Sequence, residues 1–397
     1  MKTIHPHHNF QWKQNLHYAL LIGLLSLSVA CQPNHKPDNE EQKAEGGYEN
    51  YVAETRRAAL GDDWERITQA NFAQMEGIRL RGDVIAGGLL QGSWYERGGS
   101  NVAGRMDATF YYPATEEVYS ISQSGTLFKG ALTGGTWSVQ NDAINFNSRV
   151  LGVISASGTK RIIAAKTDQY IYYSDDDGAS WTQASGSIVS GSSGGGKKLI
   201  IFSNGTLFYL QYASGSYYLY RSADNGVSWT TVQTFTSRND DRVEMFSPYG
   251  TNDLYVLDNG TALYSLTGTA TSLTAINTSM SLTTNAIYYL SGYFDGTNVT
   301  LYVVVNRSGL YKSTDLGTTW TNVSTLPSPP FNNSLLANPF VANTVYYGTI
   351  EFKKSSDGGA TFASQNAWAD YYTNTDKIHA DIGTVTPFTK SDGTKYF

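Results

Sequence analysis

Four copies of one eight-residue signature, Ser-x-Asp-x-Gly-x-x-Trp/Phe, recur along this chain of 397 residues. The copies run from Ser174 to Trp181, Ser222 to Trp229, Ser313 to Trp320 and Ser355 to Phe362. They are spaced by roughly 45 residues, with one double step between the second and third copies. Short strands repeated at this period are typical of a β-propeller with four strands in each blade.

Two weaker segments fill the gaps in this series. Residues 130–137 keep only the Gly and the Trp of the signature, and residues 265–272 have lost both its Asp and its Trp. Counted from Trp94, the repeat length predicts six to seven blades, with the last one incomplete. We therefore expect an all-β fold, a propeller of four-stranded blades preceded by a short helical segment. Because the chain ends within an expected strand at Phe397, we also expect that a longer protein continues beyond it.

The signature is expected to form a tight turn that joins two strands. Ser and Asp side chains accept hydrogen bonds from nearby backbone N–H groups, and Gly adopts the positive φ that such turns require. The aromatic residue then anchors the following strand. We therefore assign a structural role to these positions, which are Ser174, Asp176, Gly178, Trp181, Ser222, Asp224, Gly226, Trp229, Ser313, Asp315, Gly317, Trp320, Ser355, Asp357, Gly359 and Phe362.

The signature resembles the Asp-box (BNR) repeats of sialidases, sortilin-type propellers and paired-propeller xyloglucanases. The segment from Trp94 to Arg105 looks like the start of the first blade in secreted Bacteroidetes-type members, and the helical segment before it is similar to theirs. The resemblance covers residues 49–397. It implies a propeller whose boxes lie on the outer rim, away from the central site. It leaves the activity open, because such folds include hydrolases, lyases and binding modules.

The first residues are typical of a secreted bacterial lipoprotein. We interpret residues 1–30 as a signal peptide, because a basic start precedes a short apolar run. Leu-Ser-Val-Ala before Cys31, the only cysteine, resembles a lipobox and makes Cys31 the expected lipidation site. The alternative is ordinary cleavage nearby without a lipid. Residues 31–50 read as a disordered acidic tether, 51–80 as two short helices and 81–397 as the propeller. The expected location is the bacterial outer membrane or cell surface.

The composition of the chain limits the classes of partner that it can bind. The net charge is −6 and no basic stripe is present, which argues against nucleic acid as a ligand. The chain is rich in Tyr, with 28 residues, and has 8 Trp, so an aromatic face that binds a glycan or an extracellular protein is the favoured interpretation. The alternative is an extracellular glycoside hydrolase or lyase acting on polysaccharide.

Candidate chemistry is sparse in the sequence. The arginine-rich signature of the sialidases is absent, and Arg105 is the best single candidate for a ligand contact or for a structural hydrogen bond. Xyloglucanase-like hydrolysis needs two opposed carboxylates, yet the turn Ser122 to Gly125, where the resemblance places the first, has none.

His379 and Asp381 are two residues apart and, on a strand, face the same side, where they either bind a ligand or pair structurally. Two ligands do not make a metal site. The acidic runs 175–177 and 240–241 are candidates for Ca²⁺, but are more simply explained as solvated turn residues. We therefore predict no metal and no cofactor.

Overall fold

A computed structural model describes residues 106–397 apart from 133–136, 142–143, 168, 190–193, 332–333, 366, 368 and 370–380. The predicted signal peptide, Cys31, the acidic tether, the helical segment, Arg105 and His379 all lie outside the described residues. Among the described residues, no helix is both long enough and apolar enough to cross a membrane.

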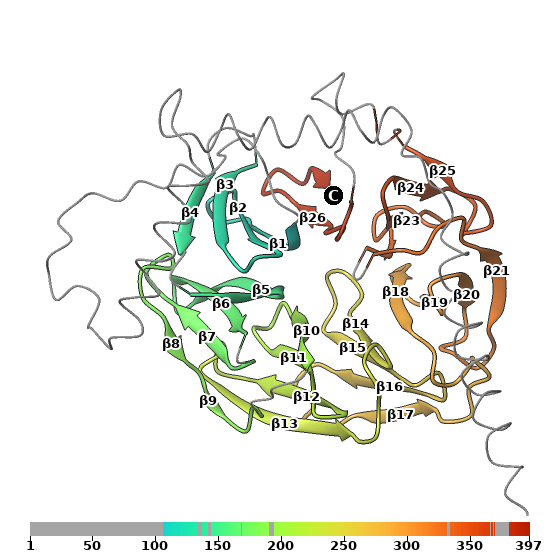
Figure 1. Ribbon diagram of the computed structural model, residues 1–397, viewed down its shortest axis with the longest axis horizontal. Coiled ribbons are helices and arrows are strands. Elements are labelled where there is room, and N and C mark those ends of the chain that lie inside the picture. Colours follow the sequence, from blue (N-terminus) through green and yellow to red (C-terminus); the bar gives the residue numbers. More distant parts are fainter. Residues whose placement is uncertain are drawn as a thin grey trace, which may run out of the picture. The chain divides into compact units, whose positions relative to one another are not determined.

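Six four-stranded blades follow one another along the chain, each built as an antiparallel meander from its inner strand to its outer strand (Figure 1). The first two blades comprise β1 (Met106–Tyr112), β2 (Glu117–Ser122), β3 (Leu127–Ala131) and β4 (Ser138–Asn141), then β5 (Phe146–Ala156), β6 (Thr159–Lys166), β7 (Ile171–Ser174) and β8 (Thr182–Gln183). The next two comprise β10 (Gly194–Ile201), β11 (Leu207–Ala213), β12 (Ser216–Ser222) and β13 (Ser228–Phe235), then β14 (Val243–Phe246), β15 (Asp253–Asp258), β16 (Ala262–Thr267) and β17 (Thr274–Asn277). The last two comprise β18 (Tyr288–Phe294), β19 (Val299–Val305), β20 (Gly309–Ser313) and β21 (Thr321–Thr325), then β22 (Leu336–Ala337), β23 (Val345–Gly348), β24 (Phe352–Ser355) and β25 (Ala363–Ser364).

Two further elements lie outside this regular scheme. Strand β9 (Ser185–Gly186) leaves the second blade and pairs in parallel with β13, the outer strand of the third. Strands β26 (Phe388–Thr389) and β27 (Lys395–Tyr396) form a two-stranded sheet. This small sheet contacts both the first and the sixth blades, because Phe388 stacks on Tyr111 of β1 at 4.4 Å and Phe397 packs on Phe340 beyond β22 at 5.7 Å. The expectation of a propeller of four-stranded blades is confirmed, and the described blades number six.

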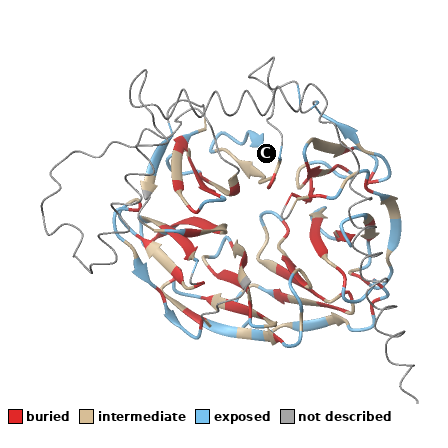
Figure 2. Ribbon diagram, viewed as in Figure 1, coloured by how far each residue is buried: buried red, intermediate tan, exposed pale blue. Residues whose placement is uncertain are grey.

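Burial follows the strand order within each blade. Figure 2 shows buried residues concentrated on the inner and middle strands and exposed residues on the outer ones. Strand β19 is buried at nearly every position, whereas β8 and β25 are exposed throughout. A middle strand is covered on both faces by neighbouring blades, which explains its continuous run of Val, Leu and Tyr. Five apolar clusters fill the spaces between consecutive blades.

Short turns rich in Asn and Gly join successive strands within the blades. Asn259 and Gly260, with φ values of 52° and 69°, lie in the loop between the paired residues Asp258 and Ala262 that joins β15 to β16. Ser203-Asn204-Gly205 joins β10 to β11. The worn repeat 265–272 spans the end of β16 and the turn that precedes β17, so it occupies the place of the signature in the fourth blade. The repeat was therefore placed correctly even where its sequence has decayed.

Candidate functional site

The repeated turn joins the third strand of a blade to the outer one, and its side chains close it internally. In the first copy the Ser174 hydroxyl donates to Asp176 at 2.8 Å and accepts the Gly178 N–H at 2.8 Å. The Asp176 carboxylate also accepts the Ser180 N–H at 2.8 Å. These hydrogen bonds from Ser180 and Ser174 lower the pKa of Asp176 to about 2. The carboxylate is therefore a structural acceptor and stays ionised at neutral pH.

The other three copies repeat this pattern. The Ser hydroxyl accepts the Gly N–H at 2.9, 2.8 and 2.8 Å. The Asp carboxylate accepts the backbone N–H of the residue just before the aromatic one, which is Ser228, Thr319 or Thr361, at 2.9, 2.9 and 3.0 Å. In each turn the residue directly before the signature Gly also has a positive φ; these residues are Asp177, Asn225, Leu316 and Gly358. Side-chain hydrogen bonds therefore close all four turns in the same way.

The acidic runs are held by cations of neighbouring strands. Asp175 forms a bidentate pair with Arg161 at 2.7 Å, and Asp177 accepts Lys160 at 2.8 Å. Asp240 and Asp241 both contact the ammonium of Lys197. In the part of the chain that the structure describes, no cluster of three or more His, Cys, Asp or Glu could hold a metal. The interpretation of these runs as solvated turn residues was therefore incomplete, because ion pairs engage them.

The principal cavity lies where the inner strands of the blades converge. It has a volume of about 630 Å³ and is lined by residues of β1, β5, β10, β14, β18 and β22, and by the segment Thr384–Thr389. Its mouth is formed by the loops that follow the inner strands, among them Tyr249–Thr251 and Pro339. Clefts at a meeting point of several elements are the usual location of binding sites. We therefore treat this cavity as the candidate site.

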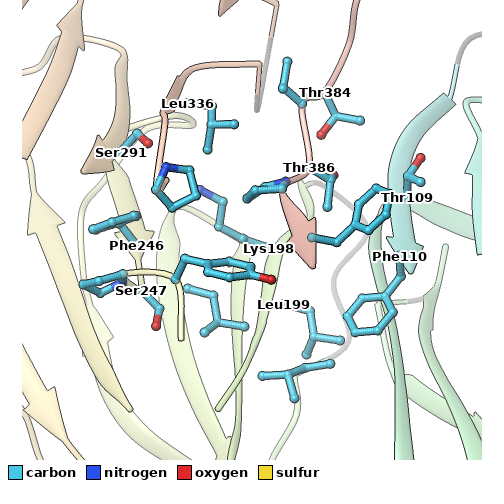
Figure 3. A pocket seen from close by; sticks show the side chains of 18 of the residues that line it. Thr109, Phe110, Lys198, Leu199, Phe246, Ser247, Ser291, Leu336, Thr384 and Thr386 are labelled. Carbon is cyan, nitrogen blue, oxygen red and sulfur yellow. The ribbon is translucent and has the colours of Figure 1, made fainter. Parts of the chain in front are cut away.

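The interior of the cavity is largely apolar. Leu199, Phe246 and Leu336 point into it from three different blades, and Thr386 faces them from the segment before β26 (Figure 3). Two of its polar side chains are already engaged within the propeller. Ser291 accepts the Ala337 N–H at 2.9 Å, and Thr109 shares a hydrogen bond with Ser120 at 3.0 Å. Apolar side chains therefore form most of the cavity wall, with Arg149 and a few hydroxyl groups among them.

One carboxylate, that of Asp107, belongs to the described lining of the cavity. It is buried, with 6% of its surface exposed, and accepts the Ser148 hydroxyl at 2.8 Å. A second carboxylate, Glu244, lies behind the wall and pairs with Lys198 at 3.1 Å. Burial raises the pKa of Glu244, and the Lys198 ammonium opposes that shift. The Lys198 ammonium also donates to the Met245 carbonyl at 3.0 Å, so it joins the third and fourth blades.

Aromatic rings flank the mouth of the cavity. Tyr249, which is 42% exposed, packs edge-on against Phe340 with ring centres 5.1 Å apart. Phe340 packs in turn on Phe397, which is 46% exposed, and the ammonium of Lys395 lies 5.1 Å from the Phe340 ring centre. Exposed aromatic groups beside a cavity are typical of binding surfaces. The rim thus continues the apolar character of the interior to the surface.

Asp381, the one individually predicted ligand residue that the structure describes, does not line the cavity. Asp381 is exposed and outside any strand, with a φ of 69°, and its N–H donates to the Ile350 carbonyl at 3.2 Å. The strand geometry on which a shared face with His379 depends is therefore not observed at Asp381. None of the sixteen signature residues lines the cavity. Phe246 and Leu336 were not identified from the sequence, because apolar strand residues of this kind occur in every blade. Lys198 was missed as well, because its partner Glu244 lies in the next blade.

The fold and cavity define the class as a β-propeller with a central ligand-sized cavity. The chain belongs to the family described as the DUF6242 beta propeller domain, whose model matches residues 180–381, slightly more than half of the chain. No curated protein matches the chain.

Several solved propellers are similar in fold. The GH74 enzyme of Niastella koreensis is 20% identical with a TM-score of 0.47, over 64% of this chain and 37% of that enzyme. YCF48 from Cyanidioschyzon merolae is 11% identical with a TM-score of 0.43, over 66% of this chain and 84% of that protein. The Aleuria aurantia lectin bound to α-methyl-L-fucoside is 15% identical with a TM-score of 0.39, over 63% of this chain and 89% of the lectin.

Proposed function

We propose that this propeller is a binding module that holds an extracellular polypeptide at the mouth of its central cavity. The observation that carries the proposal is the apolar interior beneath an aromatic rim. A buried apolar or aromatic side chain of a partner gains free energy by leaving water, about 25 cal/mol for each Å² buried. Interfaces are dominated by such anchors inserted into pockets. The cavity of about 630 Å³ has room for more than one side chain.

The same interior argues against a sugar buried inside the cavity. A sugar ring carries hydroxyl groups around its edge, and each buried hydroxyl needs a hydrogen-bond partner. Ser291 and Thr109 are already engaged with groups of the propeller itself. A glycan remains a second candidate at the rim, where the exposed faces of Tyr249 and Phe397 offer stacking surfaces.

Hydrolysis is less well supported than binding. Inverting and retaining glycosidases both need two carboxyl groups on either side of the scissile bond. Asp107 is the one carboxylate among the described lining residues, and the Ser148 hydroxyl engages it. Glu244 is 7% exposed and paired with Lys198, so neither carboxylate faces an open partner across the cavity.

We further propose that the chain is an Asp-box protein, exported and anchored to the cell envelope through a lipid on Cys31. The hydrogen bonds of the four repeated turns support the first part, and the lipobox-like residues before Cys31 support the second. Metabolic labelling with a radioactive fatty acid tests the anchor. Label should enter the wild-type chain and be lost in Cys31→Ala, and a chain that takes up no label would contradict the anchor.

The binding proposal is tested with two panels applied to the full chain. One is a displayed library of random peptides, and the other is a set of soluble polysaccharides and mucin glycans in affinity gels, with release of reducing ends measured in parallel. We expect enrichment of peptides with aromatic or aliphatic anchors and no new reducing ends. Glycan retardation without peptide enrichment would favour the rim alternative, and bond cleavage would establish a hydrolase or lyase.

A variant that fills the cavity locates the site. Thr386→Trp places a large ring among Leu199, Phe246 and Leu336, whereas Thr321→Trp, on the exposed outer strand β21, serves as a matched control. Binding of the selected peptides should be lost in Thr386→Trp and kept in Thr321→Trp. Equal binding by both variants would place the peptide site outside the cavity.

A further inference from the structure

Three consecutive inner strands depart from regular pairing at the same end of the cavity. The register shifts in β1 between Met106 and Ala108, in β5 between Phe146 and Leu151, and in β10 between Gly196 and Lys198. The inner strands β14 and β18 pair with their neighbours without a shift. Bulges re-aim side chains and are over-represented next to functional sites. Here they fall on the positions that carry Asp107, Arg149 and Lys197.

These bulges bring charged side chains together along the inner strands. Ser148, on the bulge of β5, donates to Asp107 on the bulge of β1 at 2.8 Å. Lys197, on the bulge of β10, contacts Asp240 and Asp241 before β14. Lys198 pairs with Glu244 on β14. Each of these four carboxylates therefore has a polar partner within the propeller.

Arg149 is the exception in this arrangement. It lines the cavity and is partly exposed to it, yet its side chain makes no ion pair with any residue that the structure describes. Its backbone N–H donates to the Asn147 side chain at 3.0 Å, within the bulge of β5. Arg149 is therefore a cation of the cavity lining that has no carboxylate partner among the described residues, whereas Lys197 and Lys198 each have one.

We infer that Arg149 receives a carboxylate of the bound ligand. A guanidinium binds a carboxylate through two parallel hydrogen bonds, and this interaction strengthens where water is excluded. The ligand group is therefore an apolar or aromatic moiety that bears a carboxylate: the moiety packs against Leu199, Phe246 and Leu336, and the carboxylate meets Arg149. This inference rests on the proposed function, since it names the chemistry recognised at the same cavity.

Three small probes separate the two parts of the inference. Phenylacetate carries the ring and the carboxylate, phenylacetamide is its neutral counterpart of similar shape, and benzyl alcohol retains only the ring and a hydroxyl. Binding to the full chain is followed by ligand-observed saturation-transfer NMR. The variants are Arg149→Met, Arg149→Lys and a control, Lys354→Met, which removes a cation from β24 outside the cavity lining.

We expect phenylacetate to bind the wild type at least about tenfold more tightly than phenylacetamide, a difference of about 1.4 kcal/mol. Arg149→Met should abolish this preference while leaving benzyl alcohol binding unchanged. Arg149→Lys should restore part of the preference, because a point charge replaces the bidentate fork. Lys354→Met should behave as the wild type.

Two other outcomes would overturn the inference and are distinguishable. If the probes bind but phenylacetate has no advantage, or keeps its advantage in Arg149→Met, the role of Arg149 is wrong while the cavity remains a ligand site. If none of the probes binds, or if Thr386→Trp binds them as the wild type does, the cavity itself is not the site and the proposed function fails with it.

Discussion

The hydroxyl of Tyr119 donates to the carboxylate of Asp177 at 2.7 Å, which joins the first blade to the repeated turn of the second. Lys129 and Lys160 contact the same carboxylate, and Lys160 also pairs with Glu117 at 2.8 Å. Asp177 occupies a position of the signature that is not constrained in type, since the other copies have Asn225, Leu316 and Gly358 there. The residues common to all four copies close the turn, and the variable residue Asp177 joins it to the first blade.

Asp177→Asn should therefore destabilise the propeller without breaking the turn. Asn tolerates the φ of 62° at this position, as Asn225 does at 59° in the next copy, so the loss is that of the charge. We expect a loss of about 1 kcal/mol in the free energy of unfolding at neutral pH, measured by chemical denaturation.

The same contact predicts a pH dependence. Burial alone would raise the pKa of Asp177, but hydrogen bonds from Lys129, Lys160 and Tyr119 outweigh it and lower the pKa to about 2. The pKa of an Asp in an unfolded chain is about 3.9. The ionised Asp177 carboxylate therefore stabilises the fold above that pH, and this stabilisation is lost as the pH falls from about 4 towards 2. The difference between Asp177→Asn and the wild type should shrink over that range, and a constant difference would contradict the ion-pair assignment.

Replacement by Phe should destabilise the fold to different extents at two tryptophans of the signature, Trp229 and Trp320. The Trp229 indole N–H donates to the Gly226 carbonyl at 3.1 Å and the ring is 1% exposed, whereas the Trp320 indole N–H is buried without a partner among the described residues. Trp229→Phe should cost about 2 kcal/mol more than Trp320→Phe, because only the first loses a made hydrogen bond. Thermal unfolding of the two variants checks this, and equal losses would show that volume alone matters.

Gly186 holds the parallel contact between the second and third blades. A Cβ at this position would lie 2.0 Å from the Trp229 carbonyl oxygen, while one at Gly215 would meet nothing within 4 Å. Both residues have positive φ, at 118° and 78°, so Ala is strained at either. Gly186→Ala should be more destabilising than Gly215→Ala by more than about 1 kcal/mol, since only it displaces β9 from β13. Similar denaturation midpoints for the two variants would contradict this contact.

Lys198 and Glu244 should show strong coupling. Lys198→Met leaves a carboxylate that is 7% exposed without its cation, which costs about 3–5 kcal/mol in comparable cases. Glu244→Gln in the same chain removes the buried charge and should recover most of that loss. A double-mutant cycle measures the coupling, and additive effects of the two substitutions would show that the pair is not a unit.

The repeat is the part of this fold that the sequence reveals. The Ser-x-Asp-x-Gly turns have local causes, because Ser174 bonds Asp176 and Gly178 within the same eight residues. Their spacing then predicts the blades, and even the worn copy near Ser265 falls on the expected turn. A local pattern with a fixed period is thus sufficient for the architecture.

The candidate site could not be predicted in the same way. Arg149, Lys198, Phe246 and Leu336 belong to four different blades and meet only when the ring of blades is assembled. The bulge of β5 also changes which of its residues line the cavity, and a strand pattern read from the sequence does not reveal such a change. The ion pairs of Asp175 and Asp240 were missed for a similar reason, because Arg161 and Lys197 lie on other strands.

The location of bound phenylacetate in a crystal of the full chain tests the central claim most directly. The ring should lie in the cavity among Leu199, Phe246 and Leu336, with its carboxylate within hydrogen-bond distance of the Arg149 guanidinium. Phenylacetate bound only at the outer turns or the rim, with the cavity left unoccupied, would contradict a central binding site.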